Sequence, residues 1–165
     1  DAIWQALFAR LAAAEKSWVL FDVQSANLFW LPGRSGLARV GLIDFQDMFW
    51  GPAAYDVAAI TQDARATVSP ALEAELVAHY VAARKSADAR PVDAPAFDAD
   101  AFAEAAAIAA AARAAKNLGV FARLAAAGDP AWLAHIPRVG AYLRRTLAAD
   151  VLSPLRLWYE ERLPS

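Results

Sequence analysis

Three side chains with oxygen atoms, Asp22, Asn27 and Asp44, have the types and spacing best suited to chemistry in this chain. Asn27 begins one predicted strand, and Asp44 directly follows the next, with a Pro- and Gly-containing turn at 32–36 between them. An antiparallel pair places the start of one strand beside the end of the other. Side chains 27 and 44 should therefore be near neighbours, roughly 5 Å apart at Cβ if directly opposed. Asp22 lies on the loop entering the same end, so two acids and one amide should converge there.

Oxygen ligands of this kind suit a hard cation such as Mg²⁺, which takes one or two carboxylates and fills its other positions with water and phosphate oxygens. A free carboxylate beside the metal could accept a proton from an attacking hydroxyl group. Asp and Asn are also common in turns and at helix caps. Spacing alone therefore leaves two interpretations open, a magnesium site and a set of ordinary turn residues.

The elements that must position these residues belong to a mainly α chain with a small β-hairpin element, an α+β class. The strand pattern ends at Ile43 and does not return. Strands are predicted at 18–21, 27–31 and 37–43. Helices are predicted at 2–16, 53–66, 70–85, from Asp98 or Asp100 to 127, 138–149 and 155–163, with a connecting loop at 87–97.

Composition limits the class of protein. The 165 residues suffice for one domain, and 44 of the apolar residues are Ala, which favours helices over a bulky core. The net charge of −2 argues against a nucleic-acid partner, and the longest apolar run, 105–112, is too short for a membrane span. The chain has no Cys, which excludes thiolate sites and fits a cytoplasmic location. It begins without Met inside a predicted helix, so we expect upstream sequence.

Two motifs resemble the aminoglycoside phosphotransferase/choline kinase family, a branch of the protein-kinase-like fold. They are Asp22-Val-Gln-Ser-Ala-Asn27, similar to the catalytic loop of that family, and Ile43-Asp44-Phe45, followed by the segment 51–58. The segments 30–41, 44–47, 116–124 and 136–138 are most similar to bacterial kinases that phosphorylate N-acetylmuramate and N-acetylglucosamine at the anomeric hydroxyl. The resemblance runs from about residue 5 to the end of the chain.

The resemblance implies roles for the matching residues. Asp22 would orient and deprotonate the acceptor hydroxyl, while Asn27 and Asp44 would hold Mg²⁺ on the phosphates of ATP. Asp56 would brace the catalytic loop from the following helix. Phe29 and Ile43 would form the floor under adenine, or would be plain core residues.

The residues around the catalytic Asp depart from the family pattern. Leu20 replaces a His, Phe21 a Gly or Arg, Val23 an aromatic residue and Gln24 a His. These changes alter the side chains that could support the catalytic loop through hydrogen bonds. Farther along the chain, Arg113 and Lys116 share one helix face, where they would contact an anionic group of the substrate or form a solvated basic surface.

The whole chain, 1–165, corresponds in this resemblance to the C-terminal lobe alone. Residues 1–58 would carry the helix, the catalytic loop and the metal-binding hairpin, and 59–165 a helical subdomain on the substrate side. The N-terminal ATP-binding lobe, with its Gly-containing loop and Lys, would be absent, so the isolated chain should turn over little ATP. The uncovered apolar face would then contact the missing lobe or a second copy of the chain.

The resulting prediction is an ATP-dependent phosphotransferase lobe acting on a hydroxylated small molecule, with an amino sugar as the expected acceptor. Two alternatives remain open at the level of sequence. One is a kinase lobe for aminoglycosides or choline, and the other is a non-catalytic helical binding module that keeps the fold without its chemistry.

Overall fold

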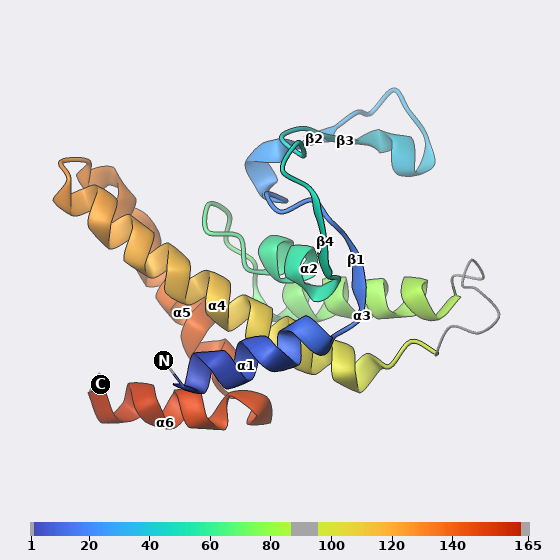
Figure 1. The fold of residues 1–165 in the computed structure, drawn as a ribbon. Coiled ribbons are helices and arrows are strands. Elements are labelled where there is room, and N and C mark those ends of the chain that lie inside the picture. The colour runs from blue at the N-terminus through green and yellow to red at the C-terminus, as the bar shows by residue number, and fades with distance from the viewer. Residues whose placement is uncertain (1, 87–95, 163–165) are drawn as a thin grey trace.

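The computed structural model describes residues 2–86 and 96–162. Most of the predicted 87–97 loop therefore lies outside the described residues. The fold is mainly α with a small β component, as the sequence predicts (Figure 1). Six α-helices are described: α1 Ala2–Ala13, α2 Ala54–Thr61, α3 Pro70–Ser86, α4 Ala99–Ala126, α5 Ile136–Thr146 and α6 Ser153–Arg162. Four short 3₁₀ turns are also described: η1 Ser25–Asn27, η2 Gly36–Arg39, η3 Pro130–His135 and η4 Asp150–Leu152.

The strands form two separate two-stranded antiparallel sheets. One pairs β2 (Leu28–Trp30) with β3 (Val40–Leu42), which is the predicted hairpin. The other pairs β1 (Lys16–Val19) with β4 (Phe49–Pro52). The expectation that no strand follows Ile43 is therefore wrong. The bulky aromatic residues of β4 suit a strand, but its partner lies about thirty residues earlier in the chain, and local patterning carries no trace of that pairing.

The long helix α4 is the axis of the helical body (Figure 1). Ile108, Ala109 and Ala111 on this helix are almost completely buried. The small side chains of α4 let α2 pack closely against this helix. Larger apolar side chains of the main core come from α5 and α6. The same cluster includes Leu7 of α1, so the first helix shares its core with the last ones. Asp98, one of the two caps that the sequence allows, caps α4 by accepting hydrogen bonds from two backbone N–H groups.

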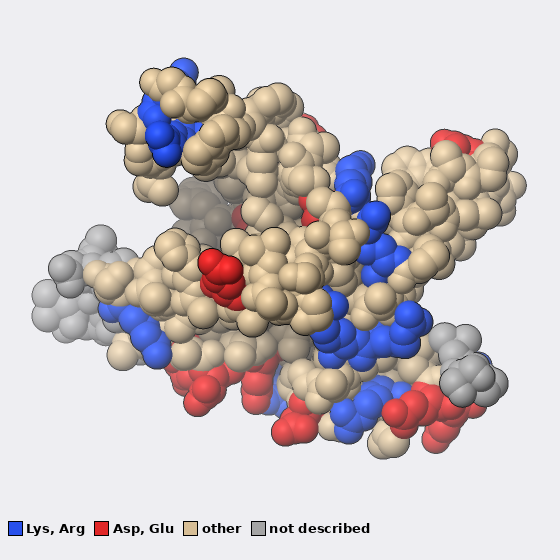
Figure 2. Space-filling model, turned by 180° about the vertical axis from the view of Figure 1, so that it is seen from behind, with Lys and Arg blue, Asp and Glu red and all other residues tan. Residues whose placement is uncertain are grey.

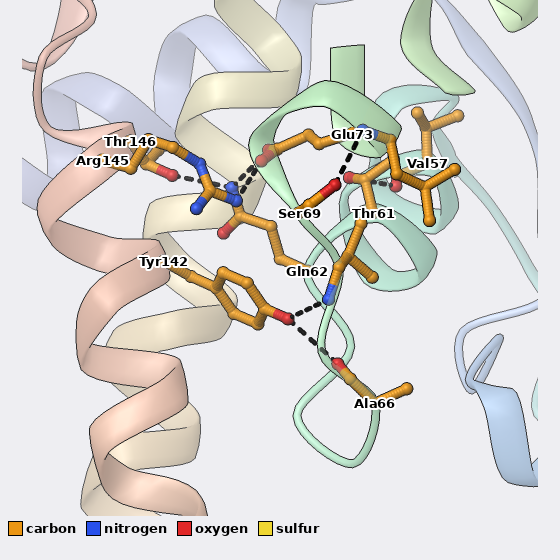
Figure 3. Close-up of polar contacts among 11 residues, drawn as sticks. Val57, Thr61, Gln62, Ala66, Ser69, Glu73, Tyr142, Arg145 and Thr146 are labelled. Carbon is orange, nitrogen blue, oxygen red and sulfur yellow. Dashed lines mark hydrogen bonds and ion pairs between the residues drawn. The ribbon is translucent and has the colours of Figure 1, made fainter. Parts of the chain in front are cut away.

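A polar network ties the end of α2 to α3 and α5 (Figure 3). The side-chain amide of Gln62 donates to Glu73 and to the hydroxyl of Thr146, both at 2.8 Å. Arg145 of α5 forms an ion pair with the same Glu73. Because these groups are half-buried and hydrogen-bonded, they fix where the chain leaves α2.

The loop after α2 is held against α5 by two side chains of that helix. The hydroxyl of Tyr142 accepts a hydrogen bond from the N–H of Val68 at 2.8 Å and donates to the carbonyl of Ala66 at 2.9 Å (Figure 3). Arg138 donates to the carbonyl of Ala64 at 2.8 Å. This loop is therefore rigidly placed, and so is Asp63, which the loop contains.

The β2–β3 hairpin projects from the helical body (Figure 1). Its side chains are largely exposed, including Trp30 and Leu42, and so are Trp18 and Trp50 of the second sheet. The sequence predicts exposed apolar surface, and these residues provide it. Within residues 2–86 and 96–162, no helix combines the length and apolar character needed to cross a membrane.

Candidate active site

Asn27 is the centre of the predicted constellation. Its side-chain nitrogen Nδ2 lies 2.9 Å from the backbone oxygen of Asp22 and 3.5 Å from Oδ2 of the same residue. It also lies 3.4 Å from Oδ2 of Asp44. Asn27 is buried although it is polar, which fits a side chain whose amide is satisfied by its neighbours. The two acids and the amide that the sequence brings together are thus adjacent in the fold.

In the register of the hairpin, Asn27 and Asp44 are one position away from lying directly opposite each other. Leu28 pairs with Leu42, so Asn27 faces Ile43, whose N–H donates to the carbonyl of Asn27 at 3.2 Å. Asp44 lies one residue beyond, with a backbone φ of 63°. This left-handed conformation, which Asp tolerates better than most residues, ends the strand at the point where the carboxylate reaches Asn27.

The donor set fits a hard cation. Nδ2 of Asn27 is used inside the protein, whereas the hydrogen bonds of the described residues leave its Oδ1 without a donor. Oδ1 of Asp44 accepts one bond, from the side-chain amide of Gln46 at 2.6 Å. The described residues contain no group of three or more His, Cys, Asp or Glu side chains that could enclose a metal. Two oxygen ligands with the remaining positions open are typical of Mg²⁺ bound together with phosphate.

Asp56 at the start of α2 holds the loop that leads to Asp22. Its carboxylate accepts hydrogen bonds from the N–H groups of Leu20 at 2.6 Å and Phe21 at 3.1 Å. Phe21 has a backbone φ of 73°, a strained conformation for an aromatic residue, and these bonds stabilise it. Burial raises the pKa of Asp56 above its ordinary value, although both N–H donors and the charge of Arg113 act to lower it.

Asp63, which sequence reasoning missed, holds the other end of the same loop. It is buried, and its carboxylate accepts hydrogen bonds from the N–H groups of Ser25, Arg65 and Ala66. Burial acts to raise the pKa of Asp63, but these donors outweigh it, so the pKa lies below its ordinary value. The bond to Ser25 joins residues 38 positions apart, and nothing in the local sequence indicates it.

The unusual Phe21 belongs to a stacked cluster. Its ring lies parallel to that of Tyr55, with centroids 5.7 Å apart. The guanidinium of Arg113 lies 4.9 Å from the centre of the Tyr55 ring, and Nζ of Lys116 lies 5.6 Å from that of Phe21. Phe21, a departure from the family pattern, is therefore held by ring contacts although it is 40% exposed, and the cluster places Arg113 and Lys116 over its rings.

A cavity of about 360 Å³ lies between α2, α3, α4 and α5, and a different cavity opens beside the loop. This second cavity has a volume of about 210 Å³ and is lined by Asp22 together with Arg113 and Lys116. Gln24, another departure from the family pattern, also lines it and donates from its amide to Oδ2 of Asp22 at 3.1 Å. A small polar molecule in this space would meet the carboxylate of Asp22 directly.

Comparison with known proteins shows the family of the chain. The profile of the phosphotransferase enzyme family, abbreviated APH, matches residues 1–95. The chain belongs to this phosphotransferase family. It is also 36% identical, over 165 residues, to an N-acetylmuramate/N-acetylglucosamine kinase of Caulobacter vibrioides. That alignment covers 99% of the chain and 43% of the relative, so the chain spans less than half the length of this protein.

Two predicted nucleotide-binding residues of this phosphotransferase chain lie apart from the cavity. Phe29 and Ile43 flank Asn27 and Asp44 in the hairpin, and each is about half exposed (48% and 52%). Neither lines the cavity beside Asp22. Within the described residues they are not part of the core, and their apolar surface is available to a flat ring.

Proposed function

We propose that this chain is the catalytic lobe of a kinase that transfers the γ-phosphoryl group of ATP to a hydroxyl of N-acetylmuramate or N-acetylglucosamine. The observation that carries the proposal is the amide of Asn27, which lies within 3.5 Å of both Asp22 and Asp44. The name of the Caulobacter relative supports the class of substrate. The identity of 36% along 99% of this chain supports carrying that substrate class to it.

In the proposed reaction, the chain's own residues position the acceptor and the phosphates. The free Oδ1 of Asn27 and the carboxylate of Asp44 would hold Mg²⁺, which neutralises charge on the phosphates of the nucleotide. Asp22 would accept the proton of the acceptor hydroxyl while that oxygen bonds to the γ-phosphorus. The bond between this phosphorus and the leaving oxygen of ADP breaks in the same step. Positioning by these side chains would supply most of the catalysis.

Supporting contacts keep Asp22 ready for this role. The amide of Gln24 donates to Oδ2 of Asp22, and the amide of Asn27 donates to its backbone carbonyl. Asp56 and Asp63 fix the two ends of the loop through backbone N–H groups. Because the loop is held at four points, it needs little rearrangement when the substrate binds, which is the condition for an efficient base.

The two alternative functions receive less support from the site. An aminoglycoside or choline acceptor is cationic, whereas Arg65, Arg113 and Lys116 line the cavity beside Asp22. A non-catalytic module has no reason to keep Asp22, Asn27 and Asp44 in contact. We therefore favour an enzyme acting on a neutral or anionic sugar.

The test is phosphorylation by the protein expressed from its complete reading frame, with Mg²⁺ and ATP and a panel of N-acetylglucosamine, N-acetylmuramate, kanamycin and choline. We expect transfer to the two amino sugars only. Asp22→Asn should lower kcat by about 10²–10⁴-fold because the base is lost. Asp47→Asn, an exposed acid near the hairpin, is the matched control and should behave like wild type. Transfer to neither sugar, or full activity of Asp22→Asn, would contradict the proposal.

A further inference from the structure

Three cationic side chains line the cavity beside Asp22. They are Arg65 from the loop after α2, and Arg113 and Lys116 from α4. The cavity also contains the carboxylates of Asp22 and Asp63. Asp63 is occupied by backbone N–H groups, and Asp22 by the amides of Gln24 and Asn27. The lining therefore has three cations and two carboxylates, and both carboxylates are already hydrogen-bonded.

None of these cations forms a direct ion pair among the described residues, although the charge of Arg113 acts on the carboxylate of Asp56. The four ion pairs found there involve Arg10, Arg84, Arg145 and Arg162. Figure 2 shows Lys and Arg side chains gathered in a band beside the projecting arm of the molecule. Cations that line a cavity and form no direct ion pair favour an anionic ligand there.

The two cations that α4 contributes to the cavity contact aromatic rings before any ligand binds. Arg113 and Lys116 are three residues apart, on one face of the helix, and each lies over an aromatic ring. A long side chain that is already ordered loses less conformational entropy when it pairs with an anion. Arg113 and Lys116 are therefore suited to bind an anion by direct contact as well as to attract it from a distance.

The acceptor sugars of the proposed function differ in one relevant group. N-acetylmuramate carries a lactyl ether that ends in a carboxylate, and N-acetylglucosamine has a hydroxyl at that position. We propose that Lys116 and Arg113 bind this carboxylate, and that the enzyme prefers N-acetylmuramate for this reason. The inference rests on the proposed function. It names Lys116 and Arg113 as the residues that select between the two substrates.

Electrostatics also set the orientation of the sugar. The carboxylate of Asp22 repels the substrate carboxylate, while Lys116 and Arg113 attract it. The sugar therefore enters with its reacting hydroxyl toward Asp22 and its carboxylate toward α4. A neutral sugar lacks this orienting force, so it should bind in more than one way and react more slowly.

The experiment compares kcat/KM for the two sugars, using the protein from its complete reading frame. Wild type should prefer N-acetylmuramate, and Lys116→Gln should lower the ratio of the two kcat/KM values about 10-fold or more, the effect expected for a lost charge-assisted hydrogen bond. Lys116→Arg keeps the charge and should retain most of the ratio. Arg123→Gln is the matched control, because this exposed residue is on the same helix outside the cavity.

The outcomes separate the two proposals. An unchanged ratio in Lys116→Gln, or a wild type with no preference for N-acetylmuramate, would overturn the inference while the kinase function stands. A wild type that phosphorylates neither sugar would overturn the proposed function itself. A ratio that falls equally in Arg123→Gln would show that general surface charge, and no defined carboxylate site, causes the preference.

Discussion

The helical body and the β2–β3 hairpin with its neighbouring loops are built in opposite ways. In the body, Ala109 and Ala111 have no exposed surface, and the helices lie close together. In the hairpin, Trp30 is 65% exposed and Leu37 is 95% exposed. The difference separates two tasks: buried apolar surface in the body stabilises the fold, while the exposed loops carry polar groups that a substrate can reach.

Two acids of the body connect these regions. Asp56 and Asp63, at the beginning and just beyond the end of α2, hold the loop around Asp22 through backbone N–H groups. The loop has little core of its own, so its shape depends on these few contacts. Substitutions in the body should therefore affect folding, those in the hairpin should affect chemistry, and those at the two acids should affect both.

The largest effect on stability should come from the core. Leu152→Ala removes a side chain that is completely buried against α4 and α6, and should lower the free energy of unfolding by about 3–4 kcal/mol. Leu42→Ala makes the same chemical change in the hairpin, where 42% of the residue is exposed, and should cost less than about 1 kcal/mol. Urea unfolding of both variants measures the difference. Equal losses would contradict the division between the two regions.

Removing the brace at Asp56 should have an intermediate effect. Asp56→Ala leaves the N–H groups of Leu20 and Phe21 without their acceptor and should cost about 2–3 kcal/mol. The positive φ of Phe21 should then relax, and kcat should fall with it. Amide hydrogen exchange at Leu20 and Phe21 measures the local effect, and Asp47→Ala is the control. Unchanged exchange at both amides would show that Asp56 does not hold the loop.

The smallest effect concerns pH. The pKa of Asp63 is lower in the folded protein than its ordinary value of 3.8, so its contribution to stability is present above that pH and disappears as the pH falls through the folded pKa. Asp63→Asn should therefore be less stable than wild type by about 1–2 kcal/mol at pH 7, and the gap should narrow toward pH 3. Urea unfolding at several pH values measures it. A gap that widens on acidification would contradict the assignment.

The sequence predicted the centre of the site because its determinants are local. Asp22 and Asn27 are on one short loop, and a tight hairpin brings Asp44 back to them, so spacing and turn residues were sufficient. The bond from Asn27 to Asp44 follows from that hairpin, although the register differs by one position. The helices were predicted for the same reason, because capping and periodicity act over a few residues.

Long-range contacts were not predictable in this way. β4 pairs with β1 across more than thirty residues, and Asp63 reaches Ser25 across 38. Each of these residues has an ordinary local environment, and its partner is identified only by tertiary packing. The role of Phe21 was hidden for the same reason, because its ring is stabilised by Tyr55 and Lys116 from other elements.

The central claim is that Asn27 and Asp44 hold a divalent cation on a nucleotide, and it is tested most directly by binding of Mn²⁺ and ATP to the protein from its complete reading frame. Electron paramagnetic resonance detects bound Mn²⁺ without any turnover. Asp44→Asn, which tolerates the left-handed backbone at this position, should weaken Mn²⁺ binding in the presence of ATP by about 10-fold or more, whereas Asp47→Asn should not. Wild-type affinity in Asp44→Asn would contradict the account.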